Sequence, residues 1–203
     1  MGYFIRVLGL NDIDIHLDEL SAALKTAGLK AAFQLGESCE PRKWSMLEVR
    51  AERGVRLVQI ERNRVVPGKL AQQELDEFRE IIRGHQPLSA VQWLDRYFGR
   101  ITVVYAFRVL DAALLDDNFE IVGAVKNTIW GRTGGLLQND LEGFSNDNGD
   151  HILWQFPEDV TGDKYCAVLD DKGSWQRFRM DLGDPFQRMA FWAGEVPQMA
   201  VRL

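Results

Sequence analysis

The sequence predicts a soluble α+β protein, because short β-strands and amphipathic helices follow one another along its 203 residues. The clearest strand pattern lies in segment 134–156, where Ile152, Trp154 and Phe156 recur at every second position, the period of a strand. In residues 71–82 the apolar side chains recur instead at helical spacing. The composition, 46% hydrophobic and 27% charged, is typical of a globular chain.

The N-terminal part is predicted to have the element order βαβββα. The expected strands are 3–10, 30–35, 44–51 and 55–62, and the expected helices are 14–27 and 71–82. Asp14 is the expected N-cap of the first helix, and Gly28 and Gly84 follow the two helices, where glycine commonly ends a helix. This order resembles half of a ferredoxin-like fold with one extra strand, and the resemblance rests on element order alone.

A break at His85-Gln86-Pro87 predicts an N-terminal α+β unit over residues 1–84 and a C-terminal α+β unit over 85–203, packed together. One continuous domain remains the alternative. The C-terminal unit is expected to be an antiparallel β-meander with flanking helices. Its predicted strands include 101–110, 165–169 and 175–180, and its helices are expected to start at caps provided by Ser89, Asp117 and Asp184.

We expect segment 134–156 to form a central hairpin, with the polar turn 145–150 between its two strands. Leu137 and Leu141 would share the apolar face of the first strand. The opposite face would be polar and is the predicted ligand- or partner-binding site, composed of Gln138, Asp140, Glu142, His151 and Gln155.

Within that face, two carboxylates are the best catalytic candidates. Asp140 and Glu142 are two positions apart, so a strand would hold them about 7 Å from each other on one face. With His151 on the neighbouring strand, they could act as a general acid and base. A solvated sheet surface explains the same pattern without any catalysis.

The charge of the chain is uneven. Residues 1–100 carry 15 basic and 14 acidic side chains, whereas residues 101–203 carry 9 and 16. An acidic C-terminal half disfavours nucleic acid and anionic lipid and favours a basic partner. Two cysteines, Cys39 and Cys166, make no disulfide framework, and with no signal peptide or membrane-spanning run the sequence predicts a cytoplasmic protein.

Cofactor and metal motifs are not matched by this sequence. Aligning Gly149 with the glycine of a calcium-binding loop puts Phe144 and Gln155 where carboxylates are required. The three histidines have no helical pairing that suits zinc, and the glycine-rich stretch 131–135 follows a helix instead of preceding one. We therefore predict neither a cofactor nor a metal.

Three functions remain open. The leading hypothesis is a non-enzymatic protein that binds another protein, in the manner of an inhibitor or immunity protein against a basic toxin. The alternative is a small-molecule-binding protein or hydrolase that uses the polar face of segment 134–156. The third is nucleic-acid binding through the arginine-rich segment 42–69.

Overall fold

The computed structural model describes residues 3–37, 39–115, 117–140 and 142–203. These residues form five α-helices and ten β-strands joined in antiparallel sheets, which confirms the predicted α+β class. The N-terminal order βαβββα is also confirmed, because β1, α1, β2, β3, β4 and α2 follow one another in that order.

The chain forms two compact units, each built from two separate segments. Unit 1 comprises residues 1–71 and 101–135, and unit 2 comprises residues 72–100 and 136–203. The predicted domain boundary between residues 84 and 85 stays a prediction, because compactness does not say which part of a chain folds on its own.

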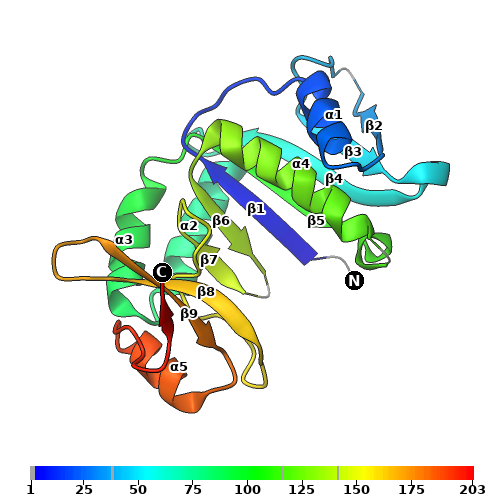
Figure 1. Cartoon of the computed structure of the whole chain (residues 1–203). Coiled ribbons are helices and arrows are strands. Elements are labelled where there is room, and N and C mark those ends of the chain that lie inside the picture. The colour runs from blue at the N-terminus through cyan, green and yellow to red at the C-terminus, as the bar shows by residue number, and fades with distance from the viewer. Residues whose placement is uncertain (1–2, 38, 116, 141) are drawn as a thin grey trace. The chain divides into compact units, whose positions relative to one another are not determined.

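In unit 1, five antiparallel strands form a sheet in the order β2-β3-β4-β5-β1 (Figure 1). The strands are β1 (Tyr3–Gly9), β2 (Ala32–Leu35), β3 (Met46–Arg50), β4 (Arg56–Arg64) and β5 (Val103–Val109). The long strand β5 lies between β1 and β4, although it follows β4 by almost forty positions in the sequence.

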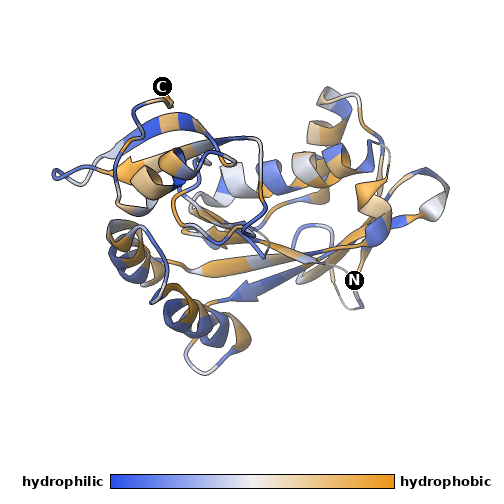
Figure 2. Cartoon of the chain, turned by 90° about the horizontal axis from the view of Figure 1, so that it is seen from below, coloured by the Kyte–Doolittle hydropathy of each residue, from blue (hydrophilic) through white to orange (hydrophobic). Residues whose placement is uncertain are grey.

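Helices α1 (Leu17–Thr26) and α4 (Asn118–Thr133) pack against each other, and α4 also contacts β1 and β4. Short 3-10 turns lie at Glu52–Gly54 and Asp111–Leu114. Figure 2 shows apolar and polar residues mixed along both the strands and the helices. In α1 the buried side chains are Leu20 and Leu24, which are spaced as expected for the apolar stripe of an amphipathic helix.

Unit 2 contains most of α2 (Leu70–Ile82) and all of α3 (Leu88–Phe98) and α5 (Pro185–Trp192). Its strands are β6 (Leu136–Asn139), β7 (Gly143–Ser145), β8 (Asp163–Leu169), β9 (Trp175–Asp181) and β10 (Val201–Arg202). β9 pairs antiparallel with both β8 and β10, and Phe178 of β9 and Phe191 of α5 belong to one buried cluster.

Two of the predicted helix caps are wrong. The first helix begins at Leu17 and not directly after Asp14, whose carboxylate instead pairs with an arginine. The third helix begins at Leu88, one residue before the proposed cap Ser89. The last helix is confirmed, because the Asp184 side chain accepts hydrogen bonds from two backbone N–H groups in the first turn of α5.

The predicted hairpin over 134–156 is also wrong in its register. β6 pairs with β7 through Asn139 opposite Gly143, so the chain reverses between these two residues as well as at the predicted turn 145–150, across which Ser145 bridges His151 antiparallel. Residues 145–150 form a second turn, after which His151 makes isolated bridges to Ser145 and Cys166. Residues 152–156 belong to no strand, and Leu141 lies outside the described residues.

Candidate functional site

The five residues of the predicted polar face occupy very different environments in unit 2. Gln138 is buried on β6, whereas Asp140 is exposed. The Glu142 carboxylate forms an ion pair with Lys164, and the Gln155 amide lies 3.4 Å from a ring nitrogen of His85. Ligand binding by these residues stays a prediction.

His151, the proposed catalytic base, is 1% exposed. Its ring lies 4.4 Å from the ring of Phe156, and neither ring nitrogen has a hydrogen-bond partner among the residues that the structure describes. Burial lowers the pKa of His151 to about 3, and the charge of Lys164 acts in the same direction. His151 is therefore a neutral, enclosed imidazole, while Asp140 faces solvent.

The turn after β7 is held by its own polar side chains. The Asn146 side-chain oxygen accepts hydrogen bonds from the backbone N–H groups of Asn148 and Asp150, both at 3.0 Å. Asp150 is 1% exposed and accepts two hydrogen bonds from the Arg177 guanidinium, at 2.6 and 3.1 Å. The many polar residues of segment 145–150 therefore have a structural role in the turn, because each of these contacts satisfies a backbone or charged group.

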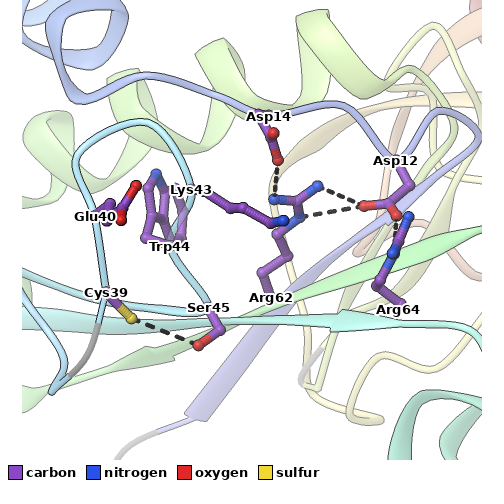
Figure 3. A pocket seen from close by; sticks show the side chains of 9 residues that line it. All are labelled: Asp12, Asp14, Cys39, Glu40, Lys43, Trp44, Ser45, Arg62 and Arg64. Carbon is purple, nitrogen blue, oxygen red and sulfur yellow. Dashed lines mark hydrogen bonds and ion pairs between the residues drawn. The ribbon is translucent and has the colours of Figure 1, made fainter.

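A pocket of about 670 Å³ lies in unit 1 and was not identified from the sequence (Figure 3). It is formed by the loop after β1, the turn that precedes β3, and the C-terminal end of β4. Three acidic and three basic side chains line it, together with Cys39, Trp44 and Ser45.

Arg62 on β4 organises this pocket. Its guanidinium donates to Asp12 at 2.6 and 3.2 Å and to Asp14 at 2.7 Å, so all three nitrogens are engaged. The side chains of Arg62 and Asp12 are each only 11% exposed. Arg64 also contacts Asp12, and this network fixes the loop after β1 onto β4.

Hydrogen bonds and a ring contact also hold the wall of the pocket in place. Trp44 is buried, its indole N–H donates to the Ile15 carbonyl at 2.8 Å, and its ring meets Tyr105 edge-on at 5.8 Å. Cys39 lies 3.6 Å from the Ser45 hydroxyl, and a hydrogen bond from the Ser45 backbone lowers the pKa of the Cys39 thiol. The pocket is therefore a rigid, strongly polar surface that suits a charged ligand.

Arginines in the segment 42–69 are largely engaged with carboxylates of the chain itself. Arg50 and Arg56 contact Glu48, while Arg62 and Arg64 contact Asp12. Such pairs reduce the charge that this segment presents to a phosphate backbone. Nucleic-acid binding stays a prediction that these contacts do not favour.

The outward face of α5 in unit 2 is apolar. Phe186 is 80% exposed and Met189 is 62% exposed, three positions apart on one side of the helix. The opposite side is anchored by Phe191, which is fully buried. Arg188 is the single charged residue of the helix, and its guanidinium donates to the carbonyls of Glu158, at 2.8 Å, and Val160, at 2.7 Å.

No family model, curated protein or solved structure matches this chain. None of the described helices combines the length and apolar composition needed to cross a lipid bilayer. Function must therefore be argued from the chemistry of the residues themselves.

Sequence reasoning missed both the pocket and the exposed face of α5. The pocket joins Asp12 to Arg62, fifty positions apart, and no local pattern signals that contact. The α5 face did leave a signal, because a helix with apolar residues on both sides and one charged residue has no side suited to water.

Proposed function

We propose that this chain is a non-enzymatic protein that binds another protein, and that the outward face of α5 is the centre of the contact. The observation that carries the proposal is the 80% exposure of Phe186 on a helix whose other side is already part of a core. A large exposed apolar patch on a helix is typical of a surface that another molecule covers. This exposed face supports the binding role that the sequence predicts.

The energy available at this face suits a binding hot spot. A phenylalanine buries about 150–250 Å² and each Å² contributes about 25 cal/mol, so covering the exposed 80% of Phe186 would contribute about 3 to 5 kcal/mol before entropy is subtracted. Met189 adds a flexible side chain that adapts to the shape of a partner. Large apolar anchors of this kind dominate protein interfaces.

The surrounding charge indicates a basic partner. Segment 181–195 contains three acidic residues, Asp181, Asp184 and Glu195, and one basic residue, Arg188. Hydrogen bonds from the Gln187 side chain and from the backbone keep the pKa of Asp184 low, so its charge persists near neutral pH. The partner that fits is a protein with apolar side chains flanked by lysine or arginine.

A basic partner is consistent with an inhibitor- or immunity-like protein, which remains the leading hypothesis. The two unpaired thiols suit the cytoplasm, where we place the protein. The lack of a catalytic constellation in the sequence supports a binding role over an enzymatic one.

The test is a quantitative pull-down from a native lysate with the full chain and two variants. Phe186→Glu places a charge at the centre of the proposed contact, whereas Tyr165→Glu changes another exposed aromatic residue of unit 2 and serves as the matched control. We expect the wild type and Tyr165→Glu to recover the same basic protein in equimolar amount, and Phe186→Glu to lose it.

Sedimentation of the purified chain distinguishes a foreign partner from a second copy. A dimer that Phe186→Glu dissociates would replace the proposal with self-association. Recovery of the same partner by Phe186→Glu at unchanged affinity would refute any role for the α5 face.

A further inference from the structure

We propose that the pocket of unit 1 binds a small molecule through an oxyanion, a phosphate or a carboxylate, which Lys43 and Arg64 hold. The site is independent of the α5 face, because all its residues belong to the other unit. Its volume of about 670 Å³ lies in the range of small-molecule pockets.

The acidic groups at the centre of the pocket are already engaged. Both oxygens of Asp12 accept from arginines, one from Arg62 and the other from Arg64. One oxygen of Asp14 accepts from Arg62. These bonds hold the carboxylates in place and set the positive charge of the arginines against their negative charge.

Two cations keep free donors. Arg64 contacts Asp12 through Nε, and its two terminal nitrogens have no partner within the described part of the chain, on a side chain that is 73% exposed. The Lys43 ammonium has no ion pair among the residues that the structure describes, and it too is exposed. A guanidinium fork and an ammonium are the groups that bind phosphate and carboxylate oxygens best.

The three cations of the pocket act together on one of its carboxylates. The hydrogen bond from Arg62 lowers the pKa of Asp14, and the charges of Lys43 and Arg64 lower it further, so all three cations act on this one carboxylate. Arg62 and Arg64 contact Asp12 and Asp14, whereas Glu40 pairs through its backbone with Lys43 and brings the lining to three acidic and three basic side chains. The third acid of the lining, Glu40, lies at the opposite end of the view in Figure 3 from Arg64, with Trp44 and Lys43 between them.

The experiment titrates the full chain with inorganic phosphate and, separately, with acetate at constant ionic strength, followed by NMR of backbone and arginine Nε signals. We expect saturable shifts at Lys43, Ser45 and Arg64. If phosphate binds more tightly than acetate, the ligand is assigned as phosphorylated. If acetate binds more tightly, the ligand is assigned as a carboxylate.

Three variants test the assignment. Lys43→Gln removes one exposed donor and leaves the Arg62 network in place, whereas Arg64→Gln removes a donor together with its contact to Asp12. Each is expected to weaken binding about threefold to tenfold. Lys69→Gln removes an exposed cation of the same segment outside the pocket and should leave binding unchanged.

Shifts that chloride reproduces at equal concentration would overturn the proposal, as would equal weakening by Lys69→Gln. Tight binding of a single-stranded oligonucleotide with steep salt dependence would overturn the small-molecule assignment in favour of nucleic acid. None of these results bears on the α5 face, so the two proposals fail separately.

Discussion

Acid should destabilise unit 2 at a pH where most proteins are still fully stable, because of one buried histidine. His151 is enclosed by Phe156 and Phe191 and has no hydrogen-bond partner among the described residues. The Leu153 backbone would favour the charged ring but does not reach hydrogen-bonding geometry, so burial dominates and the pKa falls to about 3.

The size of the effect follows from the two pKa values of His151, 6.5 when it is solvated and about 3 in the fold. Above pH 6.5 the ring is neutral in both states, and it contributes nothing to the pH dependence. As the pH falls below that value the unfolded chain takes up the proton first, so the free energy of unfolding decreases. At about 1.4 kcal/mol per unit, the loss is about 2 kcal/mol by about pH 5 and about 5 kcal/mol by about pH 3.

The assay is urea denaturation followed by tryptophan fluorescence at about pH 7, 6 and 5. Four of the six tryptophans, Trp93, Trp154, Trp175 and Trp192, lie in unit 2, so the signal mainly reports that unit. Carboxylates with lowered pKa values, such as Asp170, lose their contribution only below their ordinary value of 3.8, outside this range.

The informative variant is His151→Leu, which has no titrating group. We expect its free energy of unfolding to stay within about 1 kcal/mol of the wild type near neutral pH, since it removes polar atoms that are unpartnered. It should then lose little stability down to about pH 5. His85→Gln, which alters a less buried histidine of the same unit, should keep the loss shown by the wild type. An equal loss in His151→Leu and the wild type would refute the reasoning.

Two further substitutions test how the fold is held. Gly135→Ala should destabilise unit 1 by more than about 3 kcal/mol, because the new Cβ would stand 2.0 Å from the Leu8 carbonyl oxygen at a backbone φ of +92°. Gly131→Ala, a matched change inside α4 with nothing within 4 Å, should raise the melting temperature slightly, and thermal unfolding of both variants decides between them. Asp184→Ala removes the N-cap of α5 and should cost about 1 kcal/mol in urea denaturation; no loss would mean that the cap contributes nothing.

Local patterns in the sequence predicted local structure well. The pair β3 and β4 was expected from two strand-like runs around a short polar bend, and the structure has it. The start of α5 was expected from Asp184 and Pro185, because a capping carboxylate and a proline at the first helical position act only on their own helix. Such predictions succeed since the interactions involved span a few residues.

The candidate site was predicted less accurately from the sequence, and segment 134–156 shows the reason. Both a long hairpin and the observed pair of tight turns satisfy its alternation of apolar and polar residues. The choice depends on distant partners: the His151 backbone bonds to β8, and Asp150 pairs with Arg177. A shift of the turn moves each following side chain to a different environment, which is why His151 is buried and Asp140 exposed.

The sequence by itself determined most of the helical and extended segments, the excess of acid in the second half, and the lack of a recognisable catalytic motif. Only the tertiary structure decided that β5 lies between β1 and β4, that Arg62 joins Asp12 to Asp14, and that Phe186 is left uncovered. Periodicity records which side of an element is apolar. Which neighbour covers that side, or whether any does, depends on contacts between residues far apart in the chain.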